Sequence, residues 1–118
     1  RWGYMAEEAF RAAMSGMLES LGFKVVGKLI LEDEWGIVDE PGERHGYDIC
    51  ITRDGEEWVV EVKADVERED VAILKRKVEL YEKCRGVRPR VAIVSPFVDE
   101  RALRKAEEAG FKVFTHEG

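Results

Sequence analysis

The sequence contains few of the residues that define several classes of protein. Of its 118 residues, two are cysteine, three are proline and eleven are glycine. Two cysteines are too few for a disulfide framework, and neither Cys50 nor Cys84 lies in a CxxC or Cys/His pattern with zinc spacing, so both are interpreted as small apolar residues. No run approaches the roughly 18 apolar residues that cross a bilayer, and no short apolar stretch follows a basic N-terminus. These absences exclude a disulfide-rich secreted scaffold and a membrane-spanning helix, and they favour a cytoplasmic protein.

The composition that remains is that of one folded domain. Apolar residues make up 45% of the chain and charged residues 37%, which predicts a single domain over residues 1–118. The first residue is Arg1 and not methionine, which suits a domain taken from a longer chain. The abundance of Glu, Lys, Arg and Val is typical of thermophilic proteins. Nineteen basic and 25 acidic residues give a net charge of −6, so binding of a nucleic acid requires a local basic patch or metal ions.

Hydrophobic periodicity and turn residues predict alternating helices and strands. The predicted elements are a helix that Gly22 ends, a strand over 23–31, an acidic loop over 32–43, two antiparallel strands within 46–63, a helix over 70–85, a strand over 90–94, a helix over 99–109 and a strand over 111–114. Asp99 is the expected N-cap of the last helix. The order α-β-β-β-α-β-α-β predicts an α/β protein with a mixed central sheet flanked by helices.

The two antiparallel strands are joined by Asp54-Gly55, a favoured two-residue turn. That turn fixes the register and places Asp48 directly opposite Glu61, with Lys63 on the same side of the sheet. The same face also carries the apolar residues Cys50 and Val59. Gly46 is expected to lie opposite Lys63 on the paired strand. The other face is predicted to be core. Its residues are Tyr47, Ile49, Ile51, Trp58, Val60 and Val62.

Opposed carboxylates on paired strands repel each other, and a bound cation removes that conflict. Oxygen ligands in this arrangement suit Mg²⁺ or Mn²⁺. Lys63 could orient or deprotonate a metal-bound water, or offset charge on a phosphate in the transition state. The alternative interpretation of Asp48, Glu61 and Lys63 is a solvated strand end with a salt bridge.

Asp48, followed thirteen positions later by Glu61-Val62-Lys63 on a hairpin, resembles the PD-(D/E)XK nuclease superfamily, the restriction-endonuclease-like proteins. The α-β-β-β-α-β core of that superfamily matches the predicted element order over almost the whole chain. The chain is most similar to the archaeal branch that includes the Holliday-junction resolvases. The segment 2–10 and the same motif are also similar to an archaeal domain of unknown function often found behind a coiled coil. One departure is Tyr47, where the superfamily has Pro before the first acid.

The resemblance implies metal-dependent hydrolysis of DNA phosphodiester bonds. Asp48, Glu61 and the Val62 carbonyl would hold Mg²⁺ or Mn²⁺, and Lys63 would position the attacking water. DNA is then the expected partner, with no membrane and no organic cofactor, and the resemblance leaves room for a homodimer.

The resemblance also implies a further acid from the first helix, where Glu7 and Glu8 are available. At about 100° per residue, Glu7 lies near the apolar stripe of this helix, which faces the sheet, whereas Glu8 points away from it. Glu7 is therefore the candidate. The alternative for both is an ordinary first-turn acid favoured by the helix dipole.

Other functions and sites stay open at this point. A catalytically inactive nuclease fold, kept for dimerisation or partner binding, is the main alternative; a Rossmann-like nucleotide binder is disfavoured because no GxGxxG or P-loop follows a strand. His45 lies just before the first motif strand and is a candidate phosphate contact or a plain surface residue. Residues 75–90 hold seven bases and two acids, a local charge of +5, and form either a phosphate-tracking face or a solvated helix face.

Overall fold

The computed structural model describes residues 4–52 and 54–115, without the side chains of residues 4–8, 10 and 11. The helices are α1 (Tyr4–Ser20), α2 (Arg68–Arg85) and α3 (Glu100–Glu108). The strands are β1 (Phe23–Asp33), β2 (Glu43–Thr52), β3 (Glu57–Val62), β4 (Asp65–Val66), β5 (Arg90–Val94), β6 (Phe97–Val98) and β7 (Lys112–Phe114). The predicted elements and their order are confirmed. Strands β4 and β6 were not predicted, because two residues are too short to carry a periodic pattern.

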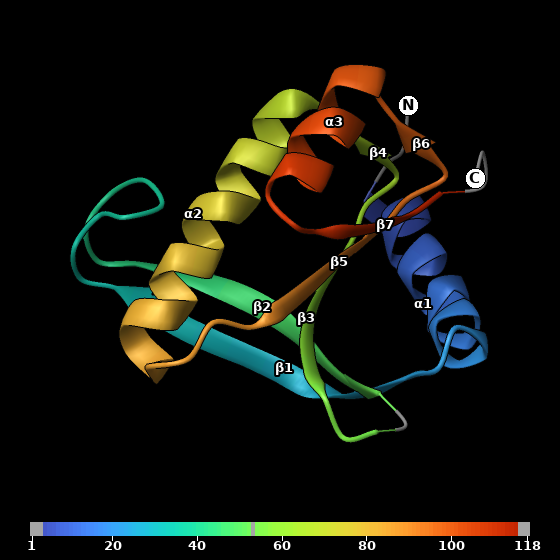
Figure 1. Ribbon diagram of the computed structural model, residues 1–118, viewed down its shortest axis with the longest axis horizontal. Coiled ribbons are helices and arrows are strands. Elements are labelled where there is room, and N and C mark those ends of the chain that lie inside the picture. Colours follow the sequence, from blue (N-terminus) through green and yellow to red (C-terminus); the bar gives the residue numbers. More distant parts are fainter. Residues whose placement is uncertain (1–3, 53, 116–118) are drawn as a thin grey trace.

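The main sheet is mixed and has helices on both faces. Its strand order is β1-β2-β3-β5-β7, in which β1, β2 and β3 are antiparallel neighbours and β3, β5 and β7 are parallel ones. The crossovers from β3 to β5 and from β5 to β7 run through α2 and α3, and right-handed crossovers in one direction place both helices on the same face. Figure 1 shows α2 and α3 beside each other and α1 on the other side of the sheet. The α/β class with a mixed sheet is confirmed.

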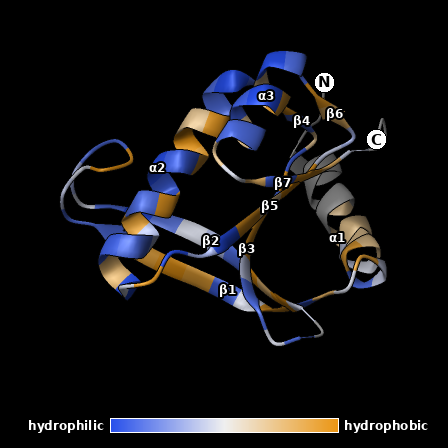
Figure 2. Cartoon of the chain, viewed as in Figure 1, coloured by the Kyte–Doolittle hydropathy of each residue, from blue (hydrophilic) through white to orange (hydrophobic). Residues whose placement is uncertain are grey.

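The buried hydrophobic residues form three clusters, two on the α2 face of the sheet and one on the α1 face; the third cluster consists of Tyr47, Ile49, Val59 and Tyr81. The cluster under α2 and α3 consists of Val66, Val71, Leu74, Val78, Val91, Ile93, Ala102, Ala106 and Phe111. The cluster under α1 consists of Leu18, Phe23, Cys50, Trp58, Val60, Val62, Ala92 and Val94. In Figure 2 strand β5, which contributes to both clusters, is hydrophobic, whereas much of α2 and α3 is hydrophilic. The central strands are therefore buried on both sides, as expected for the parallel part of a sheet.

The helix ends follow the capping residues in the sequence. Asp99 caps α3, since its carboxylate accepts the N–H groups of Arg101 and Ala102 at 3.1 and 3.2 Å. Gly86 ends α2 with φ of +78°, a conformation that favours glycine. No helix within 4–52 and 54–115 is long and apolar enough to cross a membrane. Both Cys50 and Cys84 are free cysteines; Cys50 is buried, and Cys84 lies exposed near the end of α2.

The acidic loop between β1 and β2 is shorter than the predicted loop over 32–43, and hydrogen bonds hold it in place. The β1–β2 ladder continues to the pair Asp33 and Glu43. The buried Asp33 carboxylate accepts the N–H groups of Ile37 and Val38 at 2.9 and 2.8 Å. The Val38 carbonyl in turn accepts a hydrogen bond from Arg76 Nε of α2 at 3.0 Å. Asp33 therefore folds the loop back onto the helix that covers the candidate site.

Asp33→Asn is expected to lower the melting temperature by roughly 5–10 °C, because an amide nitrogen would face backbone N–H donors. Burial acts to raise the pKa of the Asp33 carboxyl, but the backbone N–H groups of residues 35–38 together outweigh it and hold the pKa below its ordinary value. A lowered folded-state pKa stabilises the fold above the ordinary carboxyl pKa of about 4, and that stabilisation is lost as the pH falls through the lower pKa. Thermal melts of both proteins from pH 3 to 7 check this, and an equal acid sensitivity would contradict it.

The register of the β2–β3 hairpin differs by one residue from the prediction. Asp48 pairs with Val60, and Cys50 pairs with Trp58. Three residues separate Thr52 from Glu56, where the predicted turn had two residues between its paired ends. Thr52 N–H donates to Glu56 O at 2.9 Å, and Thr52 Oγ1 accepts the Glu56 N–H at 3.1 Å.

The physical reason for this error is that Asp-Gly fits two loops. Gly55 has φ of +86°, which suits the left-handed position of a three-residue loop as well as a two-residue turn. The Thr52 hydroxyl adds a hydrogen bond inside the longer loop. Turn composition alone therefore did not determine the register.

Candidate functional site

The observed register places Asp48 and Glu61 on opposite faces of the sheet. Paired residues point to the same side, so Asp48 shares a face with Val60, and the neighbouring Glu61 points to the other face. The prediction that Asp48 lies opposite Glu61 was therefore wrong. The predicted core face is also divided between the two sides. Trp58, Val60 and Val62 are buried on the α1 side with Cys50, whereas Tyr47, Ile49 and Val59 are buried on the α2 side and Ile51 is half-buried.

Glu61 and Lys63 lie together on the α2 face, and each is paired with a residue of that helix. Glu61 Oε1 is 3.8 Å from Lys77 Nζ, and Lys63 Nζ is 3.8 Å from Asp70 Oδ1. The sequence predicted only Gly46 next to Lys63, but in the structure the Lys63 ammonium lies 3.8 Å from the Asp70 carboxylate of α2. Two ion pairs, Glu61–Lys77 and Lys63–Asp70, therefore connect the end of β3 to α2.

Lys77 is the most enclosed base of this group, with a side chain that is 15% exposed. Its ammonium donates to the Gly46 carbonyl at 2.8 Å and lies 4.9 Å from the centre of the Tyr47 ring. The Tyr47 hydroxyl donates to the Lys77 carbonyl at 2.7 Å, which fixes this turn of α2 on the sheet. Burial raises the pKa of the Tyr47 hydroxyl, with smaller contributions from nearby acids that include Glu61, so it stays protonated.

Sequence reasoning did not single out Lys77. It was one base among the seven of residues 75–90. The sequence feature that could have identified Lys77 is its position on the helix. It lies three residues after Leu74 and four before Tyr81, both of which are buried against the sheet. A lysine on the inner side of an amphipathic helix indicates a buried partner for its charge.

Asp48 lies on the α1 face of the sheet. Its Oδ1 is 3.9 Å from Nζ of Lys28 on β1, and its side chain is 32% exposed. Burial, with a smaller contribution from Asp48, raises the pKa of the Cys50 thiol to about 11, which keeps this thiol protonated and unreactive at neutral pH. Asp48 is therefore a partly exposed carboxylate beside a lysine, on the same face of the sheet as the buried Cys50.

Glu7 and His45 are the two remaining candidate site residues. Glu7 belongs to α1, but the side chains of Glu7 and Glu8 lie outside the described residues, so the approach of Glu7 to Asp48 stays a prediction. His45 is on β2 with Nε2 at 3.9 Å from Glu43 Oε1, and this buried nitrogen has no hydrogen-bond partner among the residues described.

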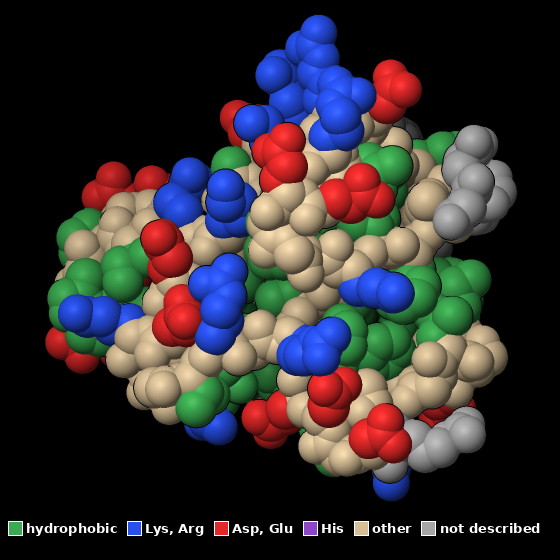
Figure 3. Space-filling view, in the orientation of Figure 1, with side chains coloured by type: hydrophobic (Ala, Val, Ile, Leu, Met, Phe, Trp, Pro, Cys, Tyr) green, Lys and Arg blue, Asp and Glu red, His purple; other side chains and the backbone are tan. Residues whose placement is uncertain are grey.

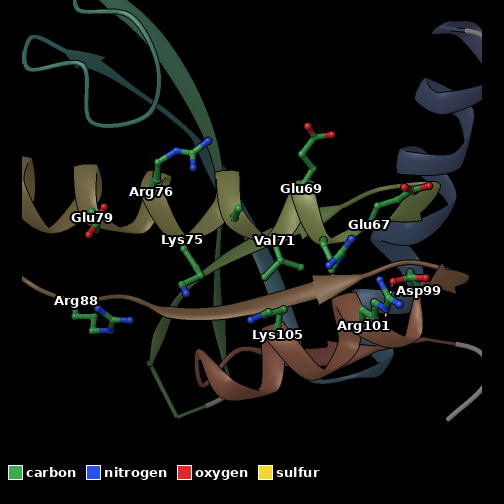
Figure 4. Close-up of a pocket in the computed structure, with 12 residues that line it drawn as sticks. Glu67, Glu69, Val71, Lys75, Arg76, Glu79, Arg88, Asp99, Arg101 and Lys105 are labelled. Carbon is green, nitrogen blue, oxygen red and sulfur yellow. Dashed lines mark hydrogen bonds between the residues drawn. The ribbon is translucent and has the colours of Figure 1, made fainter.

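A groove of about 1010 Å³ lies between α2 and α3, and Glu61, Lys63 and Lys77 are not among the residues that line it. Its lining includes six basic residues, which are Arg68, Lys75, Arg76, Arg88, Arg101 and Lys105. Figure 4 shows Lys75 and Lys105 pointing toward each other from the two helices, with Arg88 at one end. Of the acids in the lining, Asp99 is occupied in capping α3. Lys and Arg side chains are spread over this face between acidic ones (Figure 3).

Comparison with protein families identifies the fold of this hairpin and its surroundings. The family model described as PD-(D/E)XK nuclease superfamily matches residues 44–112, a segment that contains Asp48 and Glu61-Val62-Lys63. The chain belongs to the PD-(D/E)XK nuclease superfamily. A second model, for a protein of unknown function (DUF3782), matches residues 1–41. A search of curated proteins found no match.

Solved structures of nucleases share the fold of this superfamily member. EndoMS in its apo form is 23% identical with a TM-score of 0.65, and the match covers 92% of this chain and 45% of that one. A repair endonuclease from Pyrococcus abyssi is 22% identical with a TM-score of 0.63, over 96% of this chain and 46% of that one. A complex of EndoMS with double-stranded DNA is 22% identical with a TM-score of 0.59, over 92% and 44%. The chain spans less than half the length of these proteins.

PD-(D/E)XK nucleases generally use divalent metal ions, so the predicted ligands were tested against the geometry. A single ion cannot bind both Asp48 and Glu61 here, because the two carboxylates point to opposite faces. Within the described part of the chain, no group of three His, Cys, Asp or Glu side chains is placed to hold a metal ion. The set of Asp48, Glu61 and the Val62 carbonyl therefore does not fit a metal in this arrangement, and no metal-bound step is derived from it.

Proposed function

We propose that residues 1–118 form a nuclease domain that hydrolyses phosphodiester bonds in DNA and requires Mg²⁺ or Mn²⁺. The observation that carries the proposal is the family match over residues 44–112, which includes the Asp48 and Glu61-Val62-Lys63 motif in one hairpin. The fold shared with EndoMS and with a repair endonuclease supports it.

The residues proposed for the reaction are Asp48, Glu61, Lys63 and Glu7, and the Val62 carbonyl is not assigned a metal-binding role in this arrangement. Glu61 and Lys63 carry the most weight, because they lie on one face of β3 and their side chains are 28% and 33% exposed. An ammonium at Lys63 would offset the negative charge of a phosphate in the transition state. Asp70 holds Lys63 at 3.8 Å, which orients it without removing its charge.

The proposed partner is DNA, which the EndoMS complex with double-stranded DNA supports through the shared fold. A chain with a net charge of −6 needs a local positive surface to bind a polyanion. The α2–α3 groove is the candidate for that surface, because six bases and four acids line it and the bases come from two helices and from the segment before β5. We propose that the DNA backbone passes along this groove.

The proposal is tested by incubating the protein with single-stranded, duplex and branched DNA in Mn²⁺, in Mg²⁺ and in EDTA. We expect cleavage of at least one substrate with either metal and none in EDTA. Calorimetry on the same preparation measures metal binding. Absence of both cleavage and metal binding would instead support the inactive nuclease fold as an interaction module.

A further inference from the structure

Strand β1 forms one edge of the main sheet and is 11 residues long. It pairs with β2 on one side, and no other strand within 4–52 and 54–115 pairs with it (Figure 1). A bulge between Val25 and Gly27 interrupts the ladder, so the regular part of the strand runs from Gly27 to Asp33. The backbone groups along an open edge can pair with a further strand, and natural proteins usually shorten or charge such edges. The opposite edge, β7, has only three residues.

Exposed apolar side chains are concentrated along this edge. Nine large hydrophobic side chains are exposed in the part of the chain that the structure describes, and four of them fall within residues 25–35. These four are Val25, Val26, Ile30 and Trp35. Ile30 is 57% exposed and pairs with Gly46 of β2, which has no side chain to cover it. An apolar patch along an open sheet edge indicates a surface that binds another protein strand.

The charges on either side of Ile30 make this edge complementary to itself. Lys28 lies two residues before Ile30 and Glu32 two residues after it, so all three side chains point to the same face of the sheet. When two β1 strands pair antiparallel with Ile30 opposite Ile30, Lys28 of each copy lies opposite Glu32 of the other. Registers centred on Lys28 or on Glu32 place like charges opposite each other instead. Charge complementarity therefore favours one register and a second copy of this chain as the partner.

We infer that two copies of this chain form a dimer by pairing their β1 strands antiparallel about a two-fold axis at Ile30. The two main sheets then join into one continuous sheet. Beyond the ladder, the exposed Val25 and Val26 of one copy lie next to the end of β1 in the other copy, where Trp35 is exposed. Each copy uses the same edge, so the association closes at two chains. This inference does not depend on the proposed function.

Sedimentation equilibrium of residues 1–118 tests the dimer, which we expect at micromolar concentrations. Ile30→Lys is expected to raise the dimer dissociation constant by at least about 30-fold, because two ammonium groups then face each other at the axis. Val87→Lys is the matched control, since it makes the same charge change at a side chain that is 59% exposed and lies outside β1. It should leave the dimer unchanged. Ile30→Glu should weaken the dimer as Ile30→Lys does, which keeps the test open if one variant folds poorly.

A monomeric wild type at all concentrations would overturn the inference, and it would leave the edge to a strand of another protein. Equal weakening by Ile30→Lys and Val87→Lys would also overturn it, because added charge alone would then explain the loss. Circular dichroism checks that each variant is folded.

Charge reversal tests the register itself. Glu32→Lys and Lys28→Glu each place like charges opposite each other in their own dimer, so each variant alone should dimerise less than wild type. Mixed in equal amounts, the two variants should form a dimer with each other, because both cross-strand contacts then join opposite charges. Arg104→Glu and Glu100→Lys are the controls, since they reverse charges at exposed positions of α3 and should dimerise as wild type does. Failure of the mixed variants to associate would overturn the inference.

Discussion

Replacement of Glu61 by Gln is expected to lower the rate of DNA cleavage by about 10³-fold or more, and replacement of Lys63 by Gln by about 10²–10⁴-fold. Glu61 supplies the carboxylate on the α2 face of the motif strand, and Lys63 supplies a positive charge two residues further on the same face. Loss of the Lys63 charge removes the ammonium that would offset the phosphate charge in the transition state, and loss of the Glu61 charge removes a carboxylate that we propose for the reaction. Single-turnover cleavage with saturating DNA and Mn²⁺ measures the effect on the chemical step.

The matched control for this prediction is Glu57→Gln. Glu57 lies on the same strand and the same face, four residues before Glu61, but it is exposed near the hairpin loop. We expect this variant to cleave within twofold of wild type. Melting curves should show that all three variants remain folded, since Glu61 and Lys63 are partly exposed and pair with single partners on α2. Full cleavage by Glu61→Gln would remove the motif from the proposed site.

The general architecture could be predicted from the sequence because the signals for it are local. Gly86 ends α2 and Asp99 begins α3 as expected, because a left-handed glycine and an N-cap carboxylate satisfy backbone groups within a few residues. The α2 and α3 crossovers then follow from strands that alternate with helices. The superfamily motif could likewise be identified from four residues and their spacing.

The arrangement of the site could not be predicted, because it depends on contacts between distant elements. Asp54-Gly55 identified the hairpin but fits loops of two and of three residues, and this one-residue difference decides which face carries Asp48. The pairing of Glu61 with Lys77 depends on how α2 lies over the sheet, which Tyr47 fixes through its hydrogen bond across 30 residues of sequence. No local pattern specifies such a contact. The loop after Asp33 was misjudged for the same reason, since its carboxylate folds the chain back toward α2.

The second large effect is expected at the α2–α3 groove. The triple variant Lys75→Gln, Arg88→Gln and Lys105→Gln removes three bases that line it from α2, from the segment before β5 and from α3. Each phosphate contact contributes about 0.9 to the slope of log affinity against log salt for duplex DNA, so the slope should fall by about two to three. At roughly 50 mM salt this corresponds to at least about 30-fold weaker binding. Fluorescence anisotropy with labelled duplex DNA in EDTA measures binding without cleavage.

A second triple variant controls for net charge. Lys24→Gln, Arg104→Gln and Lys112→Gln remove two lysines and one arginine, as in the groove, from exposed positions outside its lining. If the DNA backbone follows the groove, this control should lose no more than about threefold in affinity, because none of its three side chains lines the groove. Equal losses in the two triple variants would mean that DNA responds to the overall charge of −6 and that the groove is a solvated helix face. Equal affinity of the wild type for polyglutamate and for DNA would mean that the groove accepts any polyanion and does not select a nucleic acid.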